Sequence, residues 1–382
     1  MKLIKFNWLK KYRLRDYDIR LVLLLIAITV IGILAVGSAE KDLQSKQILG
    51  FVGGLGLMLI VSLIDYKFIL KFWWFYYAIN TLLLGSVLIF GYSSKGATRW
   101  LDLKFIRFQP SESGKILLIL FFAKFIMVFK DRINDWRIIL LALVLIGVPE
   151  FLIFKEPDMS TTILVFCVFC LMYYVGGLSN KITLGVLGVS IPAFIFAFTQ
   201  VIQPDKGLLK FIVKDYQQTR ILAWLHPEDY ATEEAYQQLN AIMAIGSGQL
   251  NGKGLNNNVV NSVKNGNFIS EPQTDFIFTI IGEELGFIGS FTVILLLVCI
   301  AIECILIAYK AKDLDGKLIC VGMGALIGFQ TFINICVNTG LFPNTGLPLP
   351  FVSAGLTSLM SLYIGMGFVL NVRLQCERKY NN

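Results

Sequence analysis

The sequence predicts an all-α polytopic membrane protein with about ten transmembrane helices. Of its 382 residues, 56% are hydrophobic and only 16% are charged, whereas charged residues make up about a quarter of a typical soluble domain. Apolar runs recur along the chain, without the polar and apolar alternation of an outer-membrane barrel. Helices are expected because every backbone polar group inside lipid needs a hydrogen bond.

Ten apolar segments are long enough, at about 20 residues, to cross a bilayer as helices. The eighth is longer than one crossing requires, and we interpret the whole chain, residues 1–382, as a single transmembrane domain. The predicted spans are 21–38, 48–64, 72–91, 113–129, 138–154, 160–178, 182–200, 276–308, 318–339 and 356–372.

The distribution of Lys and Arg predicts that both termini are cytoplasmic. The connections that contain Arg132 and Lys312, and the tail that contains Arg373, fall on the same side as the basic amino terminus, as the positive-inside rule requires. Anionic lipid headgroups account for the net charge of +8, so no nucleic acid is implied. The amino-terminal basic residues are Lys2, Lys5, Lys10, Lys11, Arg13, Arg15 and Arg20.

A cleaved signal peptide is the rival interpretation of the amino terminus, because the small residues 37–39 follow the first apolar run. That run is long for a signal-peptide core, and further spans follow it. No cysteine falls in a predicted outer loop, so no disulfide framework is implied. The only histidine is His226, which excludes a histidine-rich metal site.

The connection between the seventh and eighth spans, 201–275, is a large extracytoplasmic loop. Its length indicates that function faces outward. Apolar residues at helical spacing around Arg220 are typical of helices on a membrane interface, although a solvated linker would fit the same pattern. The stretch GSGQLNGKG, 246–254, lacks the spacing of a nucleotide-binding loop and is interpreted as a flexible turn.

Three other outer stretches carry residues capable of chemistry. Glu112 and Lys115 are three residues apart at the start of the fourth span, so they share a helix face and can form an ion pair. A capped helix start would explain Glu112 without any function, but it would not explain Lys115. Asp158 lies at an outer helix junction, where it could simply cap the sixth span. The segment 338–358 is rich in proline and glycine, and such irregular backbone is tolerated at membrane depth where it is packed in protein or lines a cavity.

The stretch EPQTDFIFTIIGEELGF places Asp275 at the outer start of the eighth helix. Glu283 and Glu284 follow about 12 Å deeper. The helical spacing points these three side chains in different directions, so they cannot form one cluster. The deep glutamates need bonded partners inside the bundle. Asp275 is placed at the headgroup level, where a base acting on a lipid-linked substrate would lie.

Six segments resemble, in order, the signature motifs of the SEDS family of shape, elongation, division and sporulation proteins, which includes RodA, FtsW and SpoVE. The resemblance covers essentially the whole chain, and FQPSE, TDFIF and IGEELG are its most specific parts. The segments are GATRWLDL, FQPSESGK, EPDMSTT, AIGSGQLNGKG, EPQTDFIFTIIGEELGF and NTGLPLPFVSAGLTS.

The resemblance implies a ten-helix peptidoglycan glycosyltransferase that polymerises lipid II at the outer face of the cytoplasmic membrane. It also implies a class B penicillin-binding protein as the partner that crosslinks the strands. By position, Asp275 matches the family's essential aspartate. Further functional positions match Arg99, Trp100, Glu112, Lys115 and Asp158.

Two departures from the family pattern are present. Gln273 stands where the family usually has histidine, and SAGLTS at 353–358 replaces SYGGSS. An obligatory histidine acid or base is therefore not expected at that position. The basic amino terminus and the stretch RWLDLKFIRFQPSE are more similar to the RodA branch, which acts in cell-wall elongation and rod shape, than to the FtsW branch.

Glycosyl transfer from a polyprenyl diphosphate needs a base for the acceptor hydroxyl and cations for the departing diphosphate. Asp275 is the predicted base, and Arg99, Lys115 and Arg220 are the candidate cations. The sequence predicts no protein metal site and does not specify whether a divalent cation assists. One positioned carboxylate favours direct displacement with inversion, by analogy with hydrolases.

Alternative functions share these features. A lipid II flippase or another transporter would also carry intramembrane acids and helix breaks. A division-specific polymerase of the FtsW type would have the same motifs, and a scaffold that only recruits cell-wall enzymes would tolerate replacement of Asp275. The position of the acids at the outer surface, beneath a large loop, favours the enzyme.

Overall fold

The computed structural model describes residues 17–94, 97–102, 107–203, 213, 215–232, 235–256, 262, 266 and 268–376. The basic amino-terminal segment and the tail beyond Cys376, on which the predicted orientation partly depends, lie outside these residues. Parts of the long connection 201–275 lie outside them as well.

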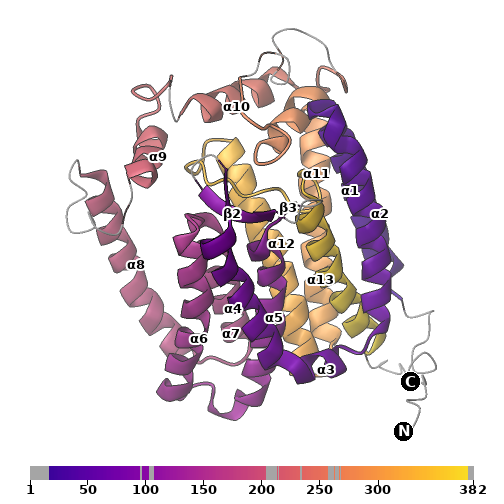
Figure 1. Ribbon diagram of the computed structural model, residues 1–382, viewed down its shortest axis with the longest axis vertical. Coiled ribbons are helices and arrows are strands. Elements are labelled where there is room, and N and C mark those ends of the chain that lie inside the picture. The colour runs from indigo at the N-terminus through magenta and orange to yellow at the C-terminus, as the bar shows by residue number, and fades with distance from the viewer. Residues whose placement is uncertain are drawn as a thin grey trace.

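Ten long helices match the ten predicted spans along the described chain. Two shorter helices, α9 (Asp215–Leu225) and α10 (Tyr236–Ser247), belong to the long connection. They lie at one end of the bundle, and the short helix α3 (Tyr66–Ile69) lies at the other (Figure 1). The long helices are α1 (Ile19–Ala39), α2 (Lys41–Leu63), α4 (Trp73–Phe90), α5 (Pro110–Val128), α6 (Trp136–Lys155), α7 (Met159–Val175), α8 (Asn180–Ile202), α11 (Ile277–Lys310), α12 (Leu314–Asn338) and α13 (Leu356–Leu374).

The fold is that of a polytopic helical membrane protein. Within the described residues, eight helices are long and apolar enough to cross a membrane. The other two long helices are α7, which is apolar but has 17 residues, and α5, which carries three charged residues. Those charges are tolerated because Glu112 and Lys115 pair inside the bundle and Lys124 lies 3.4 Å from Asp315.

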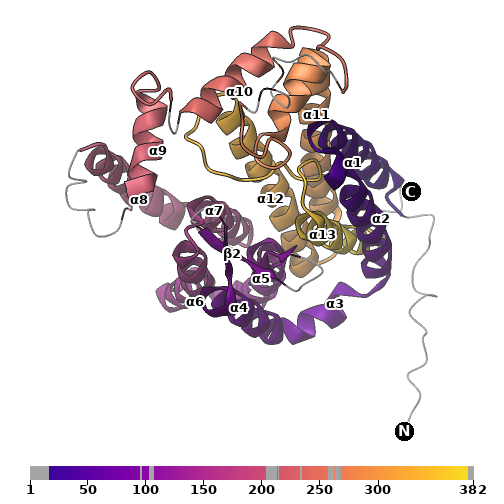
Figure 2. The same ribbon diagram turned by 45° about the horizontal axis from the view of Figure 1, so that its top comes forward.

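Helix α12 forms the centre of the bundle. It packs against α5, α7, α11 and α13, and α10 also contacts it; Figure 2 shows it between these elements. Most of its residues are buried, including the polar side chains of Gln330, Asn334 and Asn338. In contrast, α8 stands at the edge of the molecule (Figure 1), and Val201 is its only buried residue.

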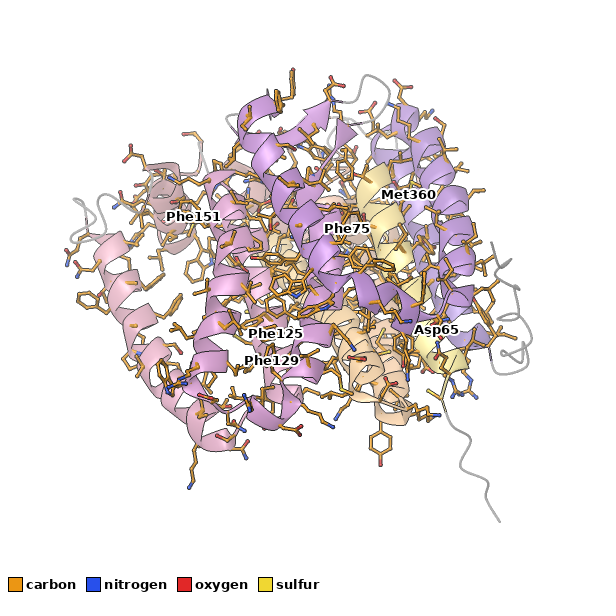
Figure 3. The ribbon with its side chains drawn as sticks, turned by 60° about the horizontal axis from the view of Figure 1, so that its bottom comes forward. Asp65, Phe75, Phe125, Phe129, Phe151 and Met360 are labelled. Atoms are coloured by element: carbon orange, nitrogen blue, oxygen red, sulfur yellow. The ribbon has the colours of Figure 1, made fainter. Side chains whose placement is uncertain are left out.

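A layer of aromatic rings joins α4 to α5. The ring centroids of Trp73 and Phe121 are 5.2 Å apart in a stacked arrangement, and Phe125 continues the cluster. Phe75 and Phe151, labelled in Figure 3, are more than half exposed on the outer surface of the bundle. Apolar side chains cover both the interior and the surface, as expected when the surrounding solvent is lipid.

The connection between α4 and α5 contains a small antiparallel sheet that the all-α prediction did not include. Its strands are β1 (Tyr92–Ser94), β2 (Ala97–Asp102) and β3 (Arg107–Phe108), in the order β1-β2-β3. Leu101 lies opposite Phe108 in the second pairing. A search for apolar runs of membrane length cannot detect strands this short. The sheet places Arg99 and Trp100 over the end of the bundle.

Helix α11 is broken near its outer end, which explains its length of 34 residues. Gly286 has φ 64° and ψ −158°, a conformation that favours glycine. The backbone groups released there pair with the 249–254 segment: Phe287 N donates to Gln249 O at 2.8 Å, and Lys253 N donates to Glu283 O at 3.0 Å. The predicted flexible turn at 246–254 is therefore wrong in one respect, because backbone hydrogen bonds fix it to α11.

The two deep glutamates of α11 have separate structural partners, as predicted. Glu283 accepts a hydrogen bond from Lys253 Nζ at 2.8 Å. Glu284 accepts from Ser38 Oγ at 2.5 Å and from the backbone N–H of Asn256 at 3.3 Å. These contacts join α11 to α1 and to the long connection, so both acids stabilise the helix break.

Candidate active site

A cavity of about 250 Å³ lies at the end of the bundle that carries the sheet and α9. Strand β2, the α6–α7 turn, the segment before α11 and the segment between α12 and α13 form its walls. It brings together all the predicted site residues except Lys115. Those lining the cavity are Arg99, Trp100, Glu112, Asp158, Arg220 and Asp275.

The Asp275 side chain is partly exposed to this cavity. Its removal from bulk water raises the pKa of Asp275 to about 6. The carboxylates of Glu271 and Asp158 add to the rise in pKa, and the guanidinium groups of Arg99 and Arg220 oppose it. Asp275 therefore has the pKa of a base that is ionised at neutral pH and still able to accept a proton.

The Arg99 side chain is anchored at the turn between α6 and α7. Its Nε donates to Glu156 O at 3.3 Å, a second N–H group donates to Pro157 O, and its Nη1 lies 3.8 Å from Asp158 Oδ2. Asp158 also caps α7 by accepting from Thr161 N at 3.2 Å, as the sequence suggested. Two backbone carbonyls and one carboxylate thus fix a guanidinium group at the cavity wall.

Glu156 lies fully buried beside this arginine. Its carboxyl oxygens make no hydrogen bond to any described residue. Burial raises the pKa of Glu156 to about 8, with Asp158 adding to the rise and Arg99 opposing it. Asp158, whose Oδ2 lies 3.8 Å from Arg99 Nη1, is the carboxylate paired with this guanidinium group.

Arg220 reaches the cavity from α9. Its Nη1 donates to Asn344 O at 3.4 Å. Two further side chains dock the long connection onto the end of α12 and the segment after it: Trp224 Nε1 donates to Gly340 O at 2.9 Å, and Gln238 Nε2 donates to Val337 O at 2.7 Å. The second cation is therefore positioned by helices that cover the end of the bundle.

The ion pair predicted between Glu112 and Lys115 is confirmed, with Nζ 2.8 Å from Oε1. Glu112 lines the cavity and also accepts from Ser358 Oγ at 2.7 Å. Lys115 does not line it. It is buried beneath Glu112, and its Nζ also lies 3.2 Å from Gln330 Oε1. This position favours Arg99 and Arg220 over Lys115 as groups that could meet an anionic substrate.

The irregular segment between α12 and α13 forms the remaining wall. Ser353 Oγ donates to Thr274 O at 2.6 Å, and Ala354 N donates to Gln273 O at 2.9 Å. Gly346 has φ 73°, and a Cβ atom placed on it would lie 3.2 Å from Asp275 Oδ2. Of the two environments that the sequence left open for this irregular segment, the structure shows the cavity wall, and glycine permits the close approach to the carboxylate.

Several cavity residues were not predicted from the sequence. Glu271, Thr161 and Ser358 line the cavity, and Gln330 bonds Lys115 below it. Glu271 and Thr161 lie within stretches already singled out, so proximity to Asp275 and Asp158 was an available signal. Within the described residues, no group of three or more His, Cys, Asp or Glu side chains is arranged to hold a metal ion.

Comparison with known proteins gives a consistent result. Residues 16–378 match the model of the FtsW, RodA and SpoVE family, described as cell cycle protein. The peptidoglycan glycosyltransferase MrdB of Escherichia coli K12 is 33% identical over 360 residues, which cover 93% of each chain. A probable peptidoglycan glycosyltransferase FtsW of Geobacter sulfurreducens is 29% identical over 93% of this chain and 95% of its own.

Two solved structures share the fold. A chain from a structure entitled "Structural coordination of polymerization and crosslinking by a peptidoglycan synthase complex" superposes with a TM-score of 0.76 at 25% identity, covering 96% of this chain and 99% of that one. The rod shape determining protein RodA of Thermus thermophilus superposes with a TM-score of 0.66 at 23% identity, covering 95% and 98%.

Replacing Lys115 with Met is expected to destabilise the protein strongly, because Glu112 would lose its buried counter-charge. Such a loss costs about 3–5 kcal/mol. Adding Glu112→Gln should restore most of the stability, since the unpaired charge is removed. Thermal unfolding of the purified variants in detergent measures both effects.

The matched control is Lys124→Met, which breaks a more exposed pair at the other end of the bundle. It should cost less than Lys115→Met, because 29% of the Lys124 side chain is exposed and solvent there can screen the Asp315 carboxylate. Equal melting temperatures for Lys115→Met and Lys124→Met would show that the Glu112–Lys115 pair is no more than a helix start.

Proposed function

Because this chain belongs to the FtsW, RodA and SpoVE family of cell cycle proteins, we propose that it is a peptidoglycan glycosyltransferase that polymerises lipid II. Lipid II is a disaccharide peptide linked to undecaprenyl diphosphate. The observation that carries the proposal is the cavity in which the Asp275 carboxylate faces Arg99 and Arg220 at one end of a membrane bundle. This set combines a base with cations for a departing diphosphate.

In the proposed reaction, a hydroxyl group of the acceptor sugar attacks the anomeric carbon of the donor. Asp275 accepts the hydroxyl proton as the new glycosidic bond forms and the bond from the anomeric carbon to the diphosphate oxygen breaks. The diphosphate leaves with the bonding electron pair. The protonated Asp275 returns its proton to solvent or to the diphosphate, which restores the base.

Arg99 and Arg220 are proposed to bind the diphosphate, since guanidinium groups match phosphate oxygens in charge and geometry. Their fixed positions avoid reorganisation as negative charge develops on the leaving group. A single carboxylate acting as a base favours direct displacement with inversion. Glu112, Asp158 and Trp100 are proposed to bind the sugar and peptide portions of the substrate.

The cavity is proposed to face the outside of the cytoplasmic membrane, with both termini inside. The basic connections at the opposite end of the bundle support this orientation, because cytoplasmic loops carry the excess of Lys and Arg. A role in cell-wall elongation is proposed from the resemblance of the stretch RWLDLKFIRFQPSE to the RodA branch. A crosslinking class B penicillin-binding protein as partner is supported by the similarity to a chain of a peptidoglycan synthase complex.

Asp275→Asn is expected to abolish polymerisation while leaving the fold and partner binding intact. The amide keeps the shape of the carboxylate but cannot accept the hydroxyl proton, so the loss should be about 10²–10⁴ in rate. The assay is glycan-strand formation from lipid II in detergent, with co-purification of the transpeptidase as the folding control. Substantial synthesis by a folded Asp275→Asn protein would exclude this residue as the base.

The rate of the wild-type protein should rise with pH through about 6, because only ionised Asp275 can act as the base. At one pH unit below that midpoint, the ionised fraction and hence the rate should be about a tenth of the plateau. Turnover measured between pH 5 and 8, with melting temperature followed over the same range, checks this. A constant rate across that range for a stably folded protein would contradict it.

Single cysteines test the orientation in a background lacking the seven native cysteines. Asn251, in the long connection, and Asp131, between α5 and α6, are both exposed. An impermeant maleimide should label Asn251→Cys on intact spheroplasts and should label Asp131→Cys only after lysis. The reverse pattern would place the cavity on the cytoplasmic side.

A further inference from the structure

We propose that Asn334 and Asn338 of α12 are positioning residues for glycosyl transfer, which act by holding the main chain of Asp275. This inference rests on the proposed role of Asp275 as the base. Neither asparagine lines the cavity, and both are buried in the centre of the bundle. They would therefore influence the reaction through the backbone that they hold, above all the backbone of Asp275.

The two carboxamides converge on one carbonyl oxygen. Asn334 Nδ2 donates to Asp275 O at 2.9 Å, and Asn338 Nδ2 donates to the same oxygen at 3.1 Å. Thr279 Oγ1 donates to Asn338 Oδ1 at 2.8 Å, which fixes the orientation of that carboxamide. Asn338 Nδ2 also donates to Asn334 O at 2.9 Å, so the two residues form one connected unit.

This carbonyl needs external donors because α11 does not supply one. In a regular α-helix, Thr279 N would donate to Asp275 O, four residues earlier. Here it donates instead to Phe276 O at 2.9 Å, and α11 begins at Ile277. The two asparagines replace the missing helical hydrogen bond at the residue that carries the proposed base.

The same unit also fixes the adjacent cavity wall. Asn334 Nδ2 donates to Leu347 O at 2.7 Å, in addition to Asp275 O. Leu347 follows Gly346, the glycine whose added Cβ would lie 3.2 Å from Asp275 Oδ2. One buried carboxamide therefore sets the spacing between the carboxylate and the backbone that packs against it.

Loss of this unit should let the 273–276 segment move toward the cavity and expose the carboxylate to water. The raised pKa of Asp275 depends on its removal from water, so the pKa should fall toward the ordinary value of 3.8. Glu271 and Asp158, which raise this pKa, and Arg99 and Arg220, which lower it, are the charged groups facing Asp275. A displaced base should also reduce turnover more than substrate binding.

The test compares Asn334→Leu and Asn338→Leu with the milder isosteric variant Thr279→Val. Asn371→Leu is the matched control, because Asn371 is also fully buried but lies at the end of α13 that is remote from the cavity. Its carboxamide donates to Ser62 O and accepts from Tyr66 N. Thr279→Val removes only the hydroxyl that orients Asn338, so it should fold even if a leucine variant does not.

Two readouts are measured on each purified protein. The first is the pH dependence of kcat, together with KM, for lipid II polymerisation. The second is labelling of Asp275 by a carbodiimide, which reacts with protonated carboxyl groups, followed over pH by mass spectrometry. The second readout does not depend on activity, so it separates a misplaced Asp275 from a wrong assignment of the base.

Both leucine variants should lower kcat at least about tenfold with a smaller change in KM, since misplacing a reacting group acts mainly on turnover. Their acid limb and their labelling midpoint should move below pH 6 together, and Thr279→Val should shift both in the same direction by less. Asn371→Leu should lose thermal stability while keeping the wild-type pH dependence.

The proposal would be overturned if the three test variants had the same labelling midpoint, and the same acid limb in the pH dependence of kcat, as Asn371→Leu. A labelling shift without any change in polymerisation would also overturn the catalytic role. In that case Asp275 is held as described but is not the base, and Asp275→Asn should then remain active. Unchanged labelling with an inactive Asp275→Asn would refute the positioning role alone.

Discussion

The structure depends on one constraint, which is that backbone polar groups at membrane depth must find hydrogen-bond partners. Helix α11 is interrupted at Gly286 and begins only at Ile277, two residues after Asp275, and α13 is preceded by an irregular segment. Each interruption releases carbonyl and N–H groups. The 249–254 segment satisfies one set, and buried amide side chains of α12 satisfy the others. The cavity exists because these partners allow irregular backbone within a helical bundle.

The charged residues of the site lie at different depths in the bundle and have different partners. The Glu112–Lys115 pair lies at the bottom, where its members satisfy each other and hold α5 against α12 and α13. Arg99 and Asp275 lie higher, with side chains that face the cavity. Burial raises the pKa of Glu156 to about 8, which disfavours a negative charge beside Arg99. In the proposed reaction, a substrate carrying a diphosphate would meet cations at the wall, beside a carboxylate whose pKa is raised to about 6.

The sequence predicted the parts of this arrangement that depend on local spacing. Hydropathy located the ten helices, and the i, i+3 spacing predicted the Glu112–Lys115 pair. Partners distant in sequence were not predictable: Ser38 for Glu284, Lys253 for Glu283 and the two asparagines for the Asp275 carbonyl. Buried amides in an apolar helix give no local signal of the backbone they will bond. The predicted position of Asp275 rested on the helix start and on resemblance, and its surroundings required the fold.

The central claim is that glycosyl transfer takes place in this cavity, with Asp275 beside the acceptor hydroxyl. A cryo-electron microscopy structure of the Asp275→Asn protein bound to lipid II tests it most directly, because the substitution should preserve the site while preventing turnover. The diphosphate should lie against Arg99 and Arg220, with an acceptor hydroxyl about 3 Å from the side chain at position 275. A diphosphate bound elsewhere, or sugars out of reach of that side chain, would contradict the account.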